Sequence, residues 1–143
     1  MEKKKTTVKK EVKLPKTVKD WKHAFSILKQ KINLPVLTGL PKADRESLDA
    51  YYKITKIVEA ENKINNNWKP NYNDPMQGKY SVWNFVKADA KRPSGFGLSY
   101  SAYFYSYTRT YVGVRLTVGD SASAIRIGKT HRKLFEKWQL GLK

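Results

Sequence analysis

One stretch in the C-terminal half of the sequence combines tyrosine and arginine at alternate positions, and it has the clearest binding chemistry of the chain. Alternate residues of a β-strand share one face of a sheet. Tyrosine rings on such a face can stack on unpaired bases at roughly 1–3 kcal/mol each, and guanidinium groups can hold phosphates. The pattern fits a platform for single-stranded nucleic acid, cross-strand packing without a ligand, or an interface with another protein. The residues concerned are Tyr103, Tyr105, Tyr107, Arg109, Tyr111 and Arg115.

Lysine and arginine form two further candidate sets for phosphate contacts. The first 14 residues are nearly half lysine and lack hydrophobic periodicity, which predicts a disordered basic arm ahead of a single α+β domain at residues 15–143. Such an arm can lie along phosphates or serve as a plain flexible tail. Its basic residues are Lys3, Lys4, Lys5, Lys9, Lys10 and Lys13, and those of the last predicted helix are Arg126, Lys129, Arg132 and Lys133.

The net charge is the strongest signal in the composition. The 143 residues include 29 Lys+Arg against 12 Asp+Glu, which gives a formal net charge of +17 and a pI near 10.0. Self-repulsion at this charge destabilises a compact domain unless an anionic partner compensates it. The charge therefore predicts either binding to a polyanion or a solubilising surface.

The sequence indicates that this chain is neither a secreted protein nor a membrane protein. No cysteine is present, which excludes disulfides, thiolate metal sites and cysteine nucleophiles. No apolar run approaches the roughly 18 residues of a membrane span, and the lysine-rich start does not resemble a secretory signal. We therefore expect a soluble, intracellular protein with no membrane partner.

Catalytic chemistry finds little support. Neither His23 nor His131 has an acidic residue or a cysteine at ligand or triad spacing, and no Walker A, HExxH or GxSxG motif occurs. We expect no enzyme activity, no metal site and no cofactor, although residues assembled only in space could still form an active site.

Hydrophobic periodicity predicts two helices in the N-terminal half. Thr17–Lys31 carries apolar residues at spacings of three and four, with Thr17 as its N-cap. Lys42–Asn65 follows a proline, which suits the first turn of a helix, and has acidic residues near its N-terminus. Turn-forming residues fill the next stretch, 67–78.

The C-terminal half predicts three antiparallel strands. They are Tyr80–Lys87, Phe96–Tyr107 and Tyr111–Val118, with the last two joined in a hairpin. Strict alternation along the second strand places one set of residues in the core with the aliphatic residues of the third strand, and it leaves the tyrosines on an open face. The predicted core set is Leu98, Tyr100, Ala102 and Phe104.

The last helix is predicted from Asp120, its N-cap, to about Leu140. Gly128 in its middle costs roughly 1 kcal/mol relative to alanine, and a close approach of the helix to the sheet would explain it. The predicted fold is α+β, with two N-terminal helices, a three-stranded antiparallel sheet and a C-terminal helix packed on that sheet.

Several short runs of the sequence together carry a resemblance to a group of known proteins. They are residues 52–60, 67–71, Lys79-Tyr80, Trp83, the PSGFG run at 93–97 and the VGVRL run at 112–116. Over about residues 48–140 the chain resembles a group of small proteins encoded by phages and prophages of Bacteroides-like bacteria. It departs from that group at Asn84 and in its basic N-terminal region. The resemblance implies a phage origin and three strands followed by a helix, and it carries over no activity and no functional residue.

These observations lead to a non-catalytic nucleic-acid-binding protein of phage origin, with DNA favoured over RNA. Its basic arm and helices would contact phosphates, and its tyrosine face would stack on bases. The alternative is a structural or packaged virion protein whose charge faces the genome or other virion proteins. A third hypothesis is an inhibitor that mimics a basic ligand of a host enzyme. The expected location is the host cytoplasm or the virion, and the oligomeric state is left open.

Overall fold

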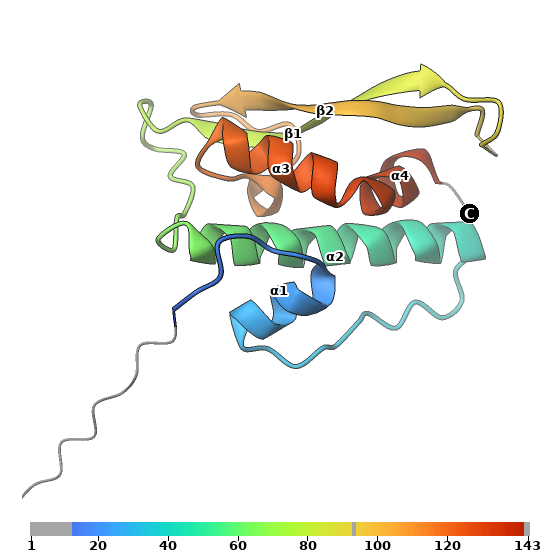
Figure 1. Ribbon diagram of the computed structural model, residues 1–143, viewed down its shortest axis with the longest axis horizontal. Helices are drawn as coiled ribbons and strands as arrows, with labels where there is room; N and C mark the ends of the chain where they lie inside the picture. The colour runs from blue at the N-terminus through green and yellow to red at the C-terminus, as the bar shows by residue number, and fades with distance from the viewer. Residues whose placement is uncertain (1–12, 93, 142–143) are drawn as a thin grey trace, which may run out of the picture.

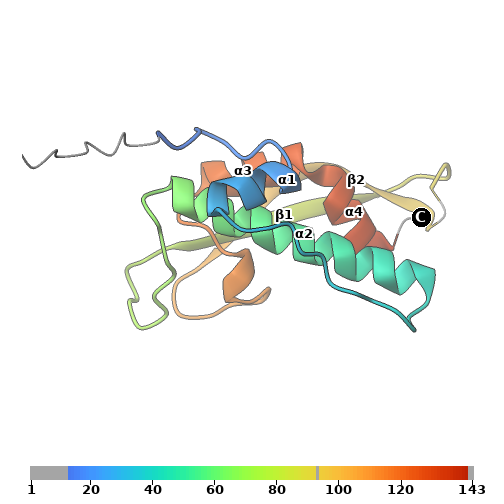
Figure 2. The same cartoon turned by 90° about the horizontal axis from the view of Figure 1, so that it is seen from below.

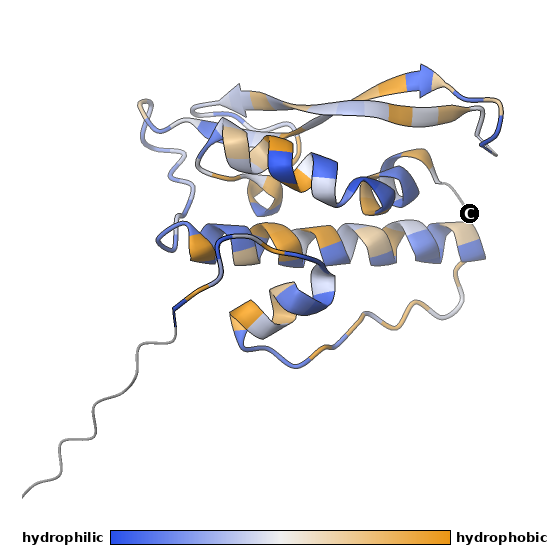
Figure 3. Cartoon of the chain, in the orientation of Figure 1, coloured by the Kyte–Doolittle hydropathy of each residue, from blue (hydrophilic) through white to orange (hydrophobic). Residues whose placement is uncertain are grey.

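A 23-residue helix, α2 (Lys42–Ile64), forms the centre of the molecule. Pro41 precedes its first turn, Asp44 lies near its positive N-terminal end and Lys63 near its negative C-terminal end, so its local charges suit a helix. Apolar and hydrophilic positions alternate around it along its whole length (Figure 3). The observed bounds agree with the predicted helix to within one residue.

The computed structural model describes residues 13–92 and 94–141, so the predicted arm at 1–14 lies almost entirely outside the described residues. The remaining elements in chain order are α1 (Trp21–Leu28), β1 (Lys79–Ala88), β2 (Phe96–Ser106), η1 (Val114–Leu116), α3 (Ser121–Thr130) and α4 (Arg132–Leu140). The fold is mixed α+β, as expected, with four α-helices and a two-stranded antiparallel sheet among the described residues.

The elements form layers on both sides of α2 (Figure 1). The sheet lies furthest from α1, and α3 and α4 lie between the sheet and α2. Seen from below, η1 lies on the opposite side of α2 from α1 and α3 (Figure 2). The core fills the space between these layers, with Ile54, Ile57, Leu116, Ile127 and Phe135 among its buried residues.

Helix α1 is shorter than predicted, because a different residue caps it. The Asp20 carboxylate accepts a hydrogen bond from the N–H of His23 at 2.8 Å, so the helix begins at Trp21 rather than after Thr17. Ahead of it, the backbone N–H of Val18 donates to the buried carboxylate of Glu61 on α2 at 3.1 Å. The C-terminal end comes at Lys29, whose left-handed φ of 56° stops the helix.

The predicted third strand is wrong. Gly113 takes a φ of 84°, which an extended strand does not tolerate, and the chain then forms the 3₁₀ helix η1. The only trace of strand pairing in this segment is one bridge, in which Val118 and Tyr80 exchange backbone hydrogen bonds of 2.9 and 2.8 Å. Leu116 and Val118 are buried as expected, whereas Val112 and Val114 are exposed.

A β-bulge changes the faces of β2 from those predicted. One residue of β1, Phe85, lies opposite two residues of β2, Ser99 and Tyr100. The extra residue reverses the alternation, so that Leu98 falls on the same side as Ser101, beneath which α3 packs. Of the predicted core set on this strand only Leu98 is buried. Tyr100 is exposed, and Ala102 and Phe104 are partly exposed.

The C-terminal helix is divided in two at His131, whose φ of −110° and ψ of 24° interrupt the helical backbone. α3 contacts both strands, and α4 packs mainly on α2. The predicted role of Gly128 is confirmed: a Cβ added there would lie 2.6 Å from the Cβ of Ser101 and 2.8 Å from a methyl group of Val82. No helix among the described residues is long and apolar enough to cross a membrane.

Candidate functional site

A pocket of about 730 Å³ lies where the segment before α1 meets the junction of α3 and α4. This volume lies within the range typical of ligand sites. Half of the twelve residues that line it are lysine or arginine, and we refer to it as the basic pocket. Its basic residues are Lys19, Arg92, Lys129, Arg132, Lys133 and Lys137.

Both acidic residues of the basic pocket are engaged by other groups of the protein. Asp20 accepts the capping hydrogen bond from the N–H of His23. Glu136, whose side chain is only 7% exposed, accepts two hydrogen bonds from the guanidinium of Arg92, at 3.1 and 3.3 Å. Arg92 also contacts Asp89 at 3.4 Å. The lysines of the pocket and Arg132 have no such ion pair among the described residues.

The break in the C-terminal helix places two helix ends of opposite dipole beside the basic pocket, the C-terminus of α3 and the N-terminus of α4. It creates a new helix N-terminus at α4, where no acidic residue lies in the first turn and no side chain caps the free N–H groups. Arg132 and Lys133 occupy this turn, beside the positive end of the helix dipole, where cations are unfavourable. An anion in the pocket would relieve this repulsion.

His131 lies at the junction itself and is buried, with 6% of its surface exposed. Burial lowers the pKa of His131 below 6.5, and the opposing effects of the Glu61 carboxylate, a hydrogen bond with the backbone of Val18 and the Asp20 carboxylate are smaller. The imidazole is therefore neutral at pH 7 and adds no charge to the basic pocket.

The predicted phosphate-binding residue Arg126 does not line the basic pocket. Its guanidinium donates to the buried carboxylate of Glu61 at 2.6 Å and to the hydroxyl of Ser123 at 3.2 Å. Because Glu61 also holds the N–H of Val18, this carboxylate joins α2 and α3 to the segment before α1. Arg126 thus stabilises the walls of the basic pocket. By contrast Lys129, Arg132 and Lys133 all line it.

Three of the predicted tyrosines come together with a fourth that the sequence did not single out. Tyr105 contacts the rings of Tyr80, Tyr103 and Tyr107, with centroid separations of 6.1, 6.5 and 5.9 Å. Tyr80 and Tyr103 are 5.5 Å apart. We call these four residues the tyrosine cluster. Part of each ring packs against the other rings of the cluster, although Tyr103, Tyr105 and Tyr107 remain more than 40% exposed.

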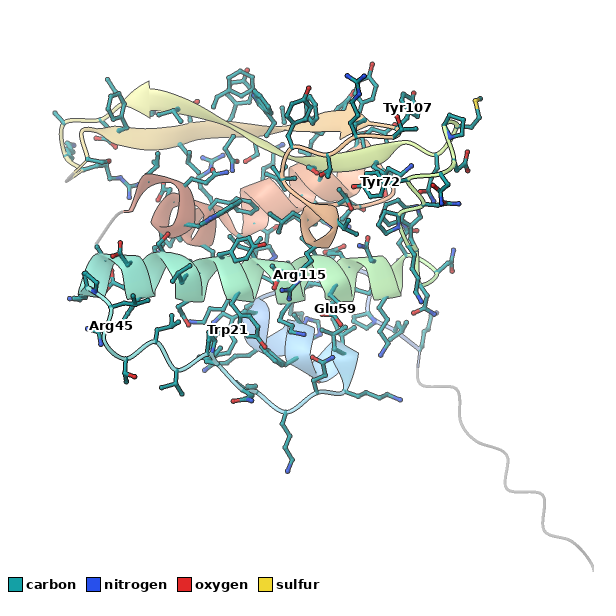
Figure 4. All side chains as sticks on the ribbon, turned by 180° about the vertical axis from the view of Figure 1, so that it is seen from behind. Trp21, Arg45, Glu59, Tyr72, Tyr107 and Arg115 are labelled. Atoms are coloured by element: carbon teal, nitrogen blue, oxygen red, sulfur yellow. The ribbon has the colours of Figure 1, made fainter. Side chains whose placement is uncertain are left out.

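The other predicted members of the tyrosine face lie elsewhere. Tyr111 packs edge-on against Phe104, at 5.0 Å, on the opposite side of β2. Arg115, in η1, reaches α2 and donates to the hydroxyl of Thr55 at 3.3 Å. Figure 4 shows Arg115 over α2 and Tyr107 beside the sheet. Arg109 is exposed in the loop after β2, where its carbonyl accepts a hydrogen bond from Ser106.

Of the predicted N-terminal lysines, Lys13 is exposed at the start of the described chain, and the others lie outside the described residues. The three pocket residues that the sequence pattern missed are Lys19, Arg92 and Lys137. They belong to different segments, and no local spacing connects them. Lys137 lies four residues after Lys133 on one helix, which is the one signal that could have grouped it.

Among the residues that the structure describes, no group of three or more His, Asp or Glu side chains could hold a metal ion. No protein-family model matches the chain, and comparisons with curated proteins and with solved structures gave no match either. The geometry and charge of the basic pocket are therefore the observations on which a functional assignment depends.

Proposed function

We propose that this chain is a non-catalytic nucleic-acid-binding protein of phage origin, and that the basic pocket holds backbone phosphates. The observation that carries the proposal is the gathering of six basic side chains from four segments into one pocket whose two carboxylates are already engaged. The resemblance to phage-encoded proteins supports the origin, and DNA is favoured over RNA.

The charge balance explains why the ligand is an anion. The pocket of about 730 Å³ is lined by six positively charged and two negatively charged side chains, and the positive ones repel one another. Such an arrangement is favourable only when an anion compensates it. Phosphate groups suit it, because arginine and lysine donate charge-assisted hydrogen bonds to several phosphate oxygens.

The charge of the whole chain favours a polymeric anion over a small one. A net charge of +17 on 143 residues far exceeds what one small anion could neutralise. A nucleic-acid backbone offers regularly spaced phosphates that can contact basic residues over a wide surface. The N-terminal lysines would then extend the same contacts outside the basic pocket.

Fluorescence anisotropy with labelled single-stranded and duplex DNA over a salt series tests this proposal. We expect wild-type protein to bind with a steep negative slope of log affinity against log salt concentration. Replacing Lys129 and Lys133 together by glutamine should make the duplex slope shallower by about 1.8, since each phosphate contact contributes about 0.9. Lys31 and Lys69 are exposed outside the pocket, and their replacement by glutamine is the control with the same change in net charge.

Equal effects of the two pairs of substitutions would show that the basic pocket does not contact phosphates in particular. Absence of binding to either DNA at low salt would refute the nucleic-acid proposal as a whole. A defined oligomer without DNA affinity would instead favour the virion component.

A further inference from the structure

Toward the turn between β1 and β2, one face of the sheet carries exposed aromatic rings, whereas near Ser81 the same face is buried. The helices pack on the other face, where Val82 and Ser101 lie against Gly128 of α3. On the aromatic side, strand alternation and cross-strand pairing place four aromatic residues, which we call the outer aromatic face. They are Trp83, Phe85, Tyr100 and Phe104.

The rings of the outer aromatic face form two cross-strand pairs. Phe85 and Tyr100 stack with their centroids 4.2 Å apart and their planes within 12°. Trp83 and Phe104 are 5.6 Å apart at 30°. Trp83 and Phe85 alternate on β1, so the two pairs lie roughly 6.6 Å apart along the strand. Tyr111 packs edge-on against Phe104 at one end of the face, so its exposed rings are those of Trp83, Phe85 and Tyr100.

The β-bulge produces this arrangement. In a regular strand Leu98, Tyr100 and Phe104 would all lie on one face. The extra residue in β2 places Leu98 in the core and leaves Tyr100 on the face of Phe104. The hydroxyl of Ser99 donates to the carbonyl of Phe85 at 3.1 Å and holds the bulge in place. Trp83, Phe85 and Tyr100 are all exposed, and exposed apolar area of this kind marks binding surfaces.

The charges around the outer aromatic face favour an anionic occupant. Neither β1 nor β2 contains an aspartate or a glutamate, and Lys87 follows Trp83 and Phe85 at the next alternate position of β1. The acidic residue of the hairpin turn, Asp89, is held by Arg92. A second copy of this chain is disfavoured as the occupant, because two chains of +17 repel each other.

We propose that the outer aromatic face binds the unpaired bases of single-stranded nucleic acid by stacking. The proposal rests on the phosphate-binding function above and adds the class of ligand to it. Bases in a duplex are stacked on one another and cannot reach these rings, whereas the bases of a single strand can. The outer aromatic face therefore gives a preference for single strands that the basic pocket alone does not.

Two tyrosines of β2 provide a matched test. Tyr100, on the outer aromatic face, is 53% exposed, and Tyr105, in the tyrosine cluster on the other face, is 52% exposed. We expect Tyr100→Ala to weaken binding of oligothymidylate by about 5- to 150-fold, the range for loss of one stacked base, with duplex affinity nearly unchanged. We expect Tyr105→Ala to leave both affinities nearly unchanged.

Tryptophan fluorescence supplies a second measurement that needs no destabilising substitution. Trp83 is the most exposed of the four tryptophans, so oligothymidylate should quench the emission of the wild-type protein. Trp83→Phe keeps an aromatic ring on the outer aromatic face, and we expect it to bind oligothymidylate while losing most of the quenching.

Three outcomes would overturn the inference. In one, Tyr100→Ala and Tyr105→Ala change single-strand affinity equally. In another, Tyr100→Ala weakens duplex binding as much as single-strand binding. In the third, sedimentation shows a dimer that Tyr100→Ala dissociates, so that a second copy covers the face. In each case wild-type protein that still binds DNA leaves the basic pocket proposal standing, whereas wild-type protein that binds neither DNA refutes the proposed function first.

Discussion

Gly128→Ala is expected to destabilise this protein even though alanine is the better helix former. Alanine in a helix interior gains about 1 kcal/mol over glycine. The new methyl group, however, would lie 2.6 Å from the Cβ of Ser101, 2.7 Å from its hydroxyl and 2.8 Å from a methyl group of Val82. Carbon atoms in contact normally lie about 3.5–4.0 Å apart. Helix α3 must therefore retreat from the sheet by about 1 Å.

The magnitude follows from two opposing effects. Forcing an extra methyl group into a packed interface costs about 1–3 kcal/mol, and the propensity gain offsets about 1 kcal/mol of that. We expect the free energy of unfolding to fall by about 0–2 kcal/mol, measured by urea denaturation with circular dichroism. Ala122→Gly, on the exposed side of the same helix, measures the propensity effect without the contact and should cost up to about 1 kcal/mol.

A double-mutant cycle identifies the contact itself. Ser101→Gly removes two of the three atoms that the new methyl group would meet. The combination of Gly128→Ala with Ser101→Gly should therefore be more stable than the sum of the single changes, by at least about 0.5 kcal/mol. Stabilisation by Gly128→Ala alone of about 1 kcal/mol, as in an uncrowded helix, would refute the close approach of α3 to the sheet.

Two further predictions concern the buried groups behind the basic pocket. Glu61→Gln breaks the ion pair with Arg126 and should lower the free energy of unfolding by about 3 kcal/mol. This is the low end for a buried pair, because the Arg126 side chain is 35% exposed. Urea denaturation measures the change, and a decrease below about 0.5 kcal/mol would contradict the prediction. Because the pKa of His131 is lower in the folded protein, the unfolded chain binds a proton at this residue more readily. The contribution of His131 to the free energy of unfolding should therefore be constant above pH 6.5 and decline as the pH falls below it, with a slope of at most about 1.4 kcal/mol per pH unit. His131→Gln should remove this part of the pH dependence, and an unchanged dependence would show that Glu61 and Asp20, which face the imidazole, outweigh its burial.

Local patterns were sufficient for the elements that local interactions stabilise. The long helix α2 was predicted to within one residue because its proline, its end charges and its apolar spacing all act within one or two turns. The bounds of β1 and β2 were predicted to within one residue for a similar reason, since β-propensity and turn residues bound them, although the hairpin was predicted between β2 and the third strand. Asp120 caps α3 as expected.

The errors arose where a long-range contact outweighed the local pattern. Residues 17–19 lie outside the helix, where the N–H of Val18 donates to Glu61, which lies 43 positions away. The segment after β2 forms only one bridge to Tyr80, because Gly113 breaks the extended run and Leu116 enters the core. The bulge at Tyr100 reversed the faces of β2, and strict alternation along one strand contains no signal for it.

The same division holds for the candidate site. Net charge is a sum over residues and does not depend on the fold, so the sequence alone determined that the chain is strongly basic and rich in aromatic residues. The tertiary structure alone decided which of these residues meet. It gathered Lys19, Arg92 and Lys137 with three predicted basic residues, paired Arg126 with Glu61, and turned Tyr100 outward. The physical reason is that helix ends, a bulge and buried hydrogen bonds orient side chains that lie far apart in the chain.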